Sequence, residues 1–349
     1  MSFIADNEHV VILGYAGFWQ GGTDFTPDDL RRMHDCGVQT VMYYINWHLI
    51  EQEMGVYDWS SIDNLVNPVL AAGMKAIVKV YAFQIPTFFP VEWYQRSPDG
   101  HVLNRVGVPD KEGNIPIRDS GAISYWHPDG WAYALGFVEK ACQHFDMPGV
   151  QCINVAPCNG EGLIFGDEPH YFDDAALASF RHYMGDAKAL PDIPTPGTPT
   201  LNWLRMTIIP RHIELQSIYA RHYGEYWTML HHAFETIPLT GNWLIDDLYY
   251  ALKAELFPAE HWGLCYTVFR QGETRGLWGP EQDVKRHGIK MLVAAECCEG
   301  LIRNTDKAIA MGMRGMFAGP LLPYAGTTVM EPWKFDAIRD SIRKWEAAQ

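Results

Sequence analysis

Two glutamates of this sequence each follow a short apolar segment, and together they can do acid–base or nucleophilic chemistry. Glu161 comes soon after the apolar residues 150–155 and lies between two glycines, which let other groups approach the backbone closely. Glu296 directly follows the apolar residues 291–295. A carboxyl group with a raised pKa can donate a proton, while a second, hydrogen-bonded carboxylate stays ionised. The sequence therefore predicts Glu161 and Glu296 as a catalytic pair.

Neighbouring carboxylates are alternatives to this pair, because the ends of strands are predicted only to within a few residues. The alternatives are Glu299 in place of Glu296, and Asp167 or Glu168 in place of Glu161. A structural interpretation is also open for both glutamates. The first would cap a turn, and the second would form an ion pair with a nearby arginine.

Eight apolar runs rich in β-branched residues alternate with amphipathic stretches, which is typical of parallel strands joined by crossover helices. The predicted strands are residues 9–15, 38–44, 74–81, 150–155, 237–243, 263–268, 289–295 and 315–319. Eight such units predict an α/β protein with a (β/α)8 TIM barrel, whose functional residues lie at the carboxyl ends of the strands. Residues 1–349 would form this single domain, with long loops after strands 3 and 4 at about residues 83–129 and 185–210.

Local signals place helices between these strands. Thr26 can cap a helix that ends before Gly37, and Ser60 can cap a second helix that ends before Gly73. Further helices are predicted around residues 131–142, 172–184, 211–235 and 333–348.

Aromatic and polar residues dominate the segments that follow the predicted strands. The sequence has 13 Trp, 17 Tyr and 16 Phe, and such rings can stack on the CH groups of a sugar or pack within the protein. Lys79, in an otherwise apolar strand, needs a partner if it is buried, and a loop carboxylate is the expected one. The candidate substrate-binding residues are Tyr15, Trp19, Asn46, Trp47, Tyr81, Trp126, Asn159, Tyr266, Trp278 and Tyr324.

The composition excludes several function classes. With 27 Lys plus Arg against 42 Asp plus Glu, the formal net charge is −15, which argues against a nucleic acid as partner.

No apolar run reaches ~18 residues and the N-terminus lacks a signal peptide, so we expect a cytoplasmic protein with no membrane partner. The seven cysteines are scattered without a CxxC pair, as is typical of reduced thiols. The histidines contain no HExxH motif, so neither a metal nor another cofactor is expected.

Three stretches resemble clan A glycoside hydrolases, especially the family 42 β-galactosidases. Trp47, Glu51, Gly55, Tyr57 and Asp58 are similar to the W-x3-E-x3-G-x-Y-D motif that follows the second strand of these enzymes. Residues 178–181 with residues 201–203 are similar to the FR and LN-x-xW elements of family 42, and residues 296–300 to its E-x-x-x-G segment. The resemblance spans roughly residues 10–325.

This resemblance implies a retaining mechanism, with the acid/base after strand four and the nucleophile after strand seven. It implies that Tyr266 holds the nucleophile, with a buried structural tyrosine as the alternative. It also implies that Trp47 and Glu51 mainly pack the second loop against the barrel, with direct contact to the sugar as the alternative. One departure concerns the acid/base. Clan A enzymes have Asn directly before this Glu, whereas Gly160 separates Asn159 from Glu161 here.

The sequence therefore predicts a hydrolase of O-glycosyl bonds that acts on a β-linked glycoside or oligosaccharide by double displacement. One alternative is a sugar-binding barrel without catalysis, which the spacing of Asn159 and Glu161 permits. Another is a metal-dependent barrel isomerase or hydrolase that uses Glu161, Asp246 and a histidine as ligands. The sequence leaves the sugar, exo or endo action and the oligomeric state open, and a homo-oligomer is compatible with it.

Overall fold

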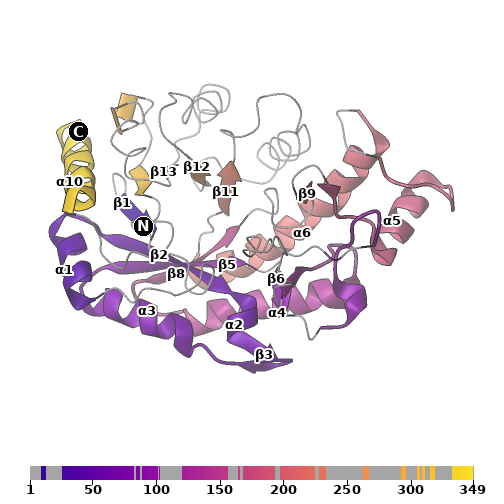
Figure 1. Cartoon of the computed structure of the whole chain (residues 1–349), viewed down its shortest axis with the longest axis horizontal. Helices are drawn as coiled ribbons and strands as arrows, with labels where there is room; N and C mark the ends of the chain where they lie inside the picture. The colour runs from indigo at the N-terminus through magenta and orange to yellow at the C-terminus, as the bar shows by residue number, and fades with distance from the viewer. Residues whose placement is uncertain are drawn as a thin grey trace, which may run out of the picture.

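Eight parallel strands form the centre of the protein in the computed structural model (Figure 1). The structure describes residues 9–12, 26–81, 84–86, 89–100, 102, 120–155, 164–165, 168–192, 197–224, 228–232, 262–266, 292–295, 305–306, 309–310, 315–318 and 332–348. The central strands are β1 (His9–Ile12), β2 (Thr40–Asn46), β5 (Lys75–Tyr81), β8 (Val150–Val155), β11 (Thr228–His232), β12 (Trp262–Tyr266), β13 (Leu292–Ala295) and β14 (Gly315–Ala318).

The hydrogen-bonded order of these strands closes on itself. The order is β1-β14-β13-β12-β11-β8-β5-β2, and β2 pairs in turn with β1. Every pairing is parallel. β2 and β5 pair along their whole length, from Thr40 opposite Lys75 to Asn46 opposite Tyr81. These pairings confirm the predicted parallel arrangement of the strands.

The fifth strand of the closed order was not predicted, and the end of a predicted helix is wrong. The fifth place in the order belongs to β11, Thr228–His232, whereas the sequence predicts a strand at residues 237–243, which lie outside the described residues. Residues 228–232 fall within the helix predicted at residues 211–235. That helix instead is α6, Pro199–Tyr223, and Gly224 ends it in the left-handed conformation with φ 70°. Gly224 is a helix stop signal, but the helical pattern predicted for residues 211–235 continued past it.

The described helices lie outside the strands. They are α1 (Pro27–Asp35), α2 (Trp47–Ile50), α3 (Ser60–Ala71), α4 (Pro128–His144), α5 (Asp174–Met184), α6 (Pro199–Tyr223) and α10 (Pro332–Ala347). In Figure 1, α3 and α4 run along the side of β2, β5 and β8, and α10 lies beside α1. No helix among the described residues is both long and apolar enough to cross a membrane.

The helix caps follow the local sequence signals in part. Thr26 forms a capping box with Asp29 at the start of α1, as predicted. The cap predicted at Ser60 is wrong, because Ser60 is the first residue of α3 and Trp59 precedes it without a side-chain cap. The carboxylate of Asp58 accepts the hydrogen bond from the backbone N–H of Ser60 instead, at 2.9 Å.

Both predicted long loops contain regular structure. The first holds β6 (Gln84–Pro86), η1 (Val91–Trp93) and β7 (Ser120–Ala122), and β6 pairs antiparallel with β7. After β8 come β9 (Ile164–Phe165), β10 (Glu168–Pro169) and α5. α6 begins at Pro199, so its first turns occupy the second predicted loop. Together these segments form the end of the molecule at the right of Figure 1.

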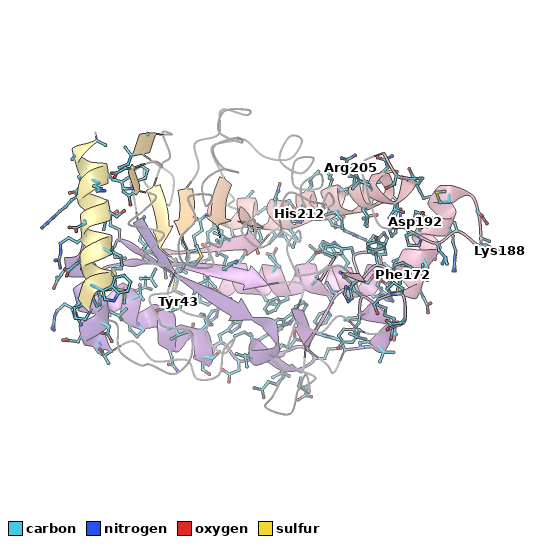
Figure 2. All side chains as sticks on the ribbon, turned by 45° about the horizontal axis from the view of Figure 1, so that its top comes forward. Tyr43, Phe172, Lys188, Asp192, Arg205 and His212 are labelled. Atoms are coloured by element: carbon cyan, nitrogen blue, oxygen red, sulfur yellow. The ribbon has the colours of Figure 1, made fainter. Side chains whose placement is uncertain are left out.

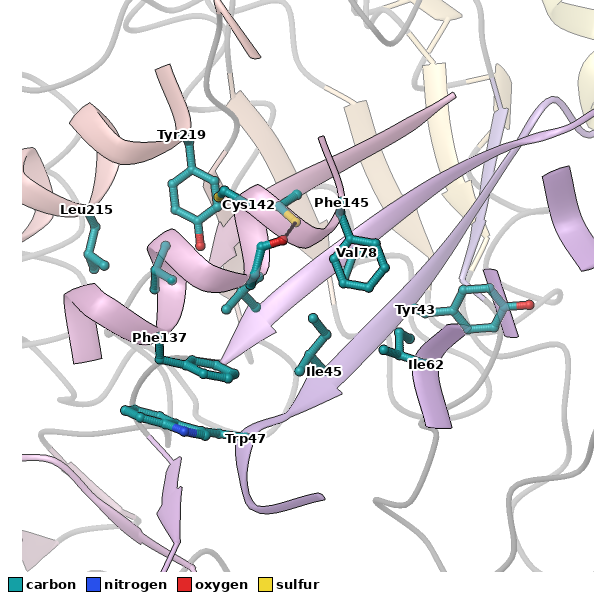
Figure 3. Close-up of a cluster of buried hydrophobic side chains, with 14 of the residues drawn as sticks. Tyr43, Ile45, Trp47, Ile62, Val78, Phe137, Cys142, Phe145, Leu215 and Tyr219 are labelled. Atoms are coloured by element: carbon teal, nitrogen blue, oxygen red, sulfur yellow. Dashed lines mark hydrogen bonds between the residues drawn. The ribbon is translucent and has the colours of Figure 1, made fainter. Parts of the chain in front are cut away.

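Alternate residues of β2, β5 and β8 face two different environments. One set packs against the helices, for example Tyr43 beside Ile62 of α3 and Val78 beside Phe145 at the end of α4 (Figure 3). The other set is equally buried but lies outside that cluster, on the side enclosed by the strands. It consists of Thr40, Met42, Ile77, Lys79, Gln151 and Ile153. The strands therefore carry a helix-facing layer and a separate interior layer.

Candidate functional site

The carboxyl end of β2 continues directly into α2, and the buried indole of Trp47 holds this junction against α4. Trp47 has no exposed surface. Its ring stacks on Phe137 with centroids 4.3 Å apart and on Tyr133 with centroids 6.2 Å apart, both nearly parallel. These contacts give Trp47 a packing role and fix the direction in which the chain leaves Asn46 (Figure 3).

A buried carboxylate organises the loop that follows. Glu51 has no exposed surface, and one of its oxygens accepts a hydrogen bond from the indole N–H of Trp47 at 2.5 Å. The other oxygen accepts bonds from the backbone N–H of Gly55 at 2.6 Å and from the hydroxyl of Tyr133. A buried carboxylate needs such donors to offset its lost hydration. Glu51 therefore ties the loop after β2 to helix α4.

The other residues of the motif support the same link between the loop after β2 and helix α4. Gly55 has a φ of 81°, which a glycine adopts without strain, in the turn between β3 (Glu51–Glu53) and β4 (Val56–Tyr57). Burial and the hydrogen bond to Glu51 raise the pKa of Tyr133, so its hydroxyl remains protonated and donates. Burial also raises the pKa of Tyr57. The packing interpretation of Trp47 and Glu51 is thus the one that the contacts support.

The second motif joins α5 to the first turns of α6, near the residues labelled at the right of Figure 2. Phe180 of α5 packs edge-on against Trp203 of α6, with ring centroids 5.1 Å apart. The indole N–H of Trp203 donates to the hydroxyl of Ser179 at 3.0 Å. The FR and LN-x-xW elements therefore contact each other and hold α5 onto α6.

Trp126, a candidate stacking residue, lies beside this pair and is partly buried. Its ring stacks on Trp203 with centroids 4.5 Å apart, and its indole N–H donates to the hydroxyl of Thr207 at 3.0 Å. One face of the Trp126 ring is therefore covered by protein. Any stacking on a ligand has to use the other face.

A buried polar contact that the sequence did not indicate fixes the backbone around Trp126. Ser124 donates from its hydroxyl to the carboxylate of Asp173 at 2.8 Å and accepts from the backbone N–H of Trp126 at 3.3 Å. The same Asp173 oxygen caps α5 through the N–H of Ala176 at 3.0 Å. Burial raises the pKa of Asp173. An Asp before a helix was a visible capping signal, but its partner 49 residues away was not.

Polar side chains also lie in the interior layer of the strands. Lys79 of β5 has no exposed surface, and Gln151 of β8 is 1% exposed. Neither amide atom of Gln151 has a hydrogen-bond partner in the described part of the chain. Because polar groups are costly to bury, these two positions mark the strand interior as more than an apolar core.

Several predicted site residues cannot be placed in this geometry. Tyr266, Asn46 and Tyr81 are described through their backbone only, as the last residues of β12, β2 and β5. Among the alternatives, Glu168 begins β10, and Asp167 and Glu299 fall outside the described residues. The other predicted residues outside them are Tyr15, Trp19, Asn159, Glu161, Trp278, Glu296 and Tyr324. Within the described residues no group of three or more His, Cys, Asp or Glu is arranged to hold a metal ion.

No protein-family model and no curated protein matches the sequence, so the comparison rests on solved structures. The catalytic domain of a β-amylase from Paenibacillus polymyxa superposes with a TM-score of 0.68 at 11% identity, over 98% of this chain and 99% of that one. A β-galactosidase from the psychrophilic Marinomonas ef1 gives 0.64 at 11% identity, over 97% of this chain and 59% of that one. One from Bacillus circulans gives 0.65 at 10% identity, over 98% and 56%. The chain shares its fold with these solved structures and spans little more than half of the two galactosidases.

Proposed function

We propose that this protein is a retaining glycoside hydrolase that acts on a β-linked glycoside or oligosaccharide. Glu161 would serve as the acid/base and Glu296 as the nucleophile in a double displacement. The observation that carries this proposal is the superposition of the whole chain on glycosidase barrels, with a glutamate following strands β8 and β13. The active site would lie at the carboxyl ends of the strands.

The register of the strands supports a complete (β/α)8 barrel. Added around the closed order, the register offsets of the eight pairings bring a row back to its starting strand with a displacement of eight residues. A displacement, or shear, of eight over eight strands is that of TIM barrels.

The same register favours Glu296 over Glu299 as the nucleophile. Ala294 is connected through the hydrogen-bonded row to Thr40, which belongs to the interior layer. Positions 296 and 299 lie outside the described residues. Counted along the sequence from Ala294, position 296 keeps the two-residue alternation of a strand, whereas position 299 has the opposite parity. A carboxylate two residues beyond Ala294 would thus extend over the mouth of the barrel.

The rim residues would bind the sugar around this pair. The set that we propose is Tyr15, Trp19, Asn46, Tyr81, Trp126, Asn159, Tyr266, Trp278 and Tyr324, with Tyr266 holding the nucleophile. Trp47 is left out because its ring is buried between Phe137 and Tyr133. β-Galactosidases and a β-amylase are both similar to this chain, so the substrate panel has to include more than galactosides.

Hydrolysis of nitrophenyl glycosides of both anomers and of unbranched oligosaccharides tests the proposal. We expect one sugar to be released by the wild type and by neither Glu296→Gln nor Glu161→Gln, although both variants remain folded. NMR of the first product would show the β-anomer from a β-linked substrate if the mechanism retains configuration. If Glu296→Gln kept most of the wild-type rate, the assignment of Glu296 as the nucleophile would be refuted. Glycan binding without turnover by the folded wild type would favour a sugar-binding barrel.

A further inference from the structure

Lys79 places a buried positive charge inside the ring of strands. It is the fifth residue of β5, two positions before the carboxyl end of the strand at Tyr81, and has no exposed surface. It belongs to the interior layer with Ile77, and its register partner on β8 is Ile153. An ammonium group removed from water needs a charged or strongly polar partner.

The acidic partner of such a charge has to come from beyond the strands. The eight central strands, as bounded in the structure, contain neither Asp nor Glu. The other titratable residues at interior register positions are Lys75, Tyr44, Tyr81, His231 and Cys265, and none of them carries a carboxylate. Lys79 lies nearer the carboxyl ends of the strands than the amino ends, so the segments after the strands supply the nearer carboxylates.

The strand register identifies which segment faces Lys79. Residues at one height in a barrel with eight strands and a shear of eight are displaced by one position per strand from the hydrogen-bonded row. The row of Ala294 passes through Phe317, Val10 and Thr40 to Lys75 of β5. These are four steps, and 75 + 4 gives 79. Lys79 and Ala294 therefore occupy the same height on opposite strands of the closed order.

Continued by one residue past its described end at Ala295, β13 would carry position 296 one layer above this height. In a TIM barrel, alternate strands contribute to the same layer of side chains, and β5 and β13 are the third and seventh strands. At the height of Lys79 these alternate strands carry Ile12, Met229 and Ala294. Two residues further, roughly 6.6 Å along the strand, are Tyr81 and His231, neither of which carries a carboxylate. Glu296 lies outside the described residues and is the carboxylate that a continued β13 would bring to that layer.

We propose that Lys79 is a positioning residue that binds the carboxylate of Glu296 from below and orients it toward the anomeric carbon. This inference rests on the proposed function, in which Glu296 is the nucleophile. An eight-stranded barrel is just wide enough for side chains from opposite strands to meet, and an alanine opposite Lys79 leaves room for a long side chain. Below Lys79 the interior carries Ile77 and, in register with it, the neutral amide of Gln151, and neither supplies a carboxylate.

Three lysine variants test the effect on catalysis through the pH dependence of kcat/KM. Lys79→Met removes the charge and keeps a stem of similar length, Lys79→Arg keeps the charge, and Lys75→Met is the control at a half-buried position of the same strand. A nearby positive charge favours the ionised carboxylate. We expect the acidic limb to move to higher pH by about one unit or more in Lys79→Met, and to stay in place in Lys79→Arg and Lys75→Met. An unchanged limb in Lys79→Met overturns the proposal.

Thermal unfolding of double variants separates this inference from the proposed function. A buried charge that loses its partner is strongly destabilising, so Lys79→Met should lower the unfolding temperature by about 5 °C or more. Adding Glu296→Gln should recover at least half of this loss, whereas adding Glu299→Gln or Glu161→Gln should not. This recovery of the unfolding temperature is expected even if the protein hydrolyses no substrate. It can also be measured when Lys79→Met alone fails to fold, because the double variant with Glu296→Gln should then fold. A double variant with Glu296→Gln that is no more stable than Lys79→Met refutes the contact.

Discussion

Replacing Glu51 with glutamine keeps the shape of a buried side chain but exchanges one carboxylate oxygen, a hydrogen-bond acceptor, for an NH2 group, a donor. In the native loop both carboxylate oxygens accept from fixed donors, namely the indole N–H of Trp47, the backbone N–H of Gly55 and the hydroxyl of Tyr133. A glutamine offers one oxygen and one NH2 group. Whichever way the amide turns, the NH2 group meets at least one of these donors.

The size of the effect follows from this count. The variant loses at least one hydrogen bond to a charged acceptor, worth about 1.5–3 kcal/mol, and leaves a buried donor unsatisfied at a cost of about 1–3 kcal/mol. Because such terms overlap, we expect Glu51→Gln to lower the free energy of unfolding by about 3 kcal/mol. Glu53→Gln, at an exposed position of the same strand β3, should change it by less than ~0.5 kcal/mol.

Urea unfolding followed by tryptophan fluorescence measures both values, and Tyr133→Phe supplies a second check. In the wild type Tyr133→Phe removes a hydrogen bond to a charged acceptor, whereas in Glu51→Gln it removes at most one to a neutral amide. The double variant should therefore be more stable than the sum of the two single effects predicts, by about 1 kcal/mol. A Glu51→Gln variant within ~1 kcal/mol of the wild type, or one that behaves like Glu53→Gln, would show that the carboxylate does not hold this loop.

Two further predictions concern stability. Burial lowers the pKa of His212 to about 3; since this folded-state pKa lies below the unfolded value of ~6.5, stability is lost as pH falls. The urea midpoint should report a loss between pH 7 and pH 5 that is about 2 kcal/mol larger in the wild type than in His212→Leu, whereas exposed His182→Gln should behave like the wild type. In helix α4, a Cβ added to Gly130 would meet Trp93 at 3.1 Å, whereas one added to Gly136 meets nothing within 4 Å. Thermal unfolding should show Gly130→Ala less stable and Gly136→Ala more stable than the wild type by ~0.5–1 kcal/mol; equal effects at both positions would contradict the contact.

Elements governed by short-range signals were predictable from the sequence. The bounds of β8 agree at both ends, and α1 has the cap at Thr26 that its sequence indicates. These cases depend on residues within one turn of each other, where propensity and capping decide the structure. β11 was missed for the opposite reason. Thr228–His232 has no alternating apolar pattern and becomes a strand because β8 and β12 supply hydrogen-bonding partners on both sides.

The candidate site shows the same division between local and distant information. The spacing of Trp47, Glu51 and Gly55 lies within a few residues, so their contact was predictable from the motif. Tyr133, which is 82 residues from Glu51, and Asp173, which is 49 residues from Ser124, reach their partners only through the fold. Single-sequence reasoning contains no signal for such pairs. It could therefore identify candidate carboxylates but not the groups that fix the loops around them.

The energetics of buried ion pairs indicate why the interior of the strands would retain the buried Lys79. Replacing a buried ion pair with neutral side chains of similar volume is often neutral or stabilising, whereas breaking the pair is costly. If Lys79 bonds Glu296, the variant that carries both Lys79→Met and Glu296→Gln should be folded, about as stable as the wild type, and inactive. A buried charge that stability does not require, at the height from which it reaches a proposed nucleophile, is then explained by catalysis rather than by folding.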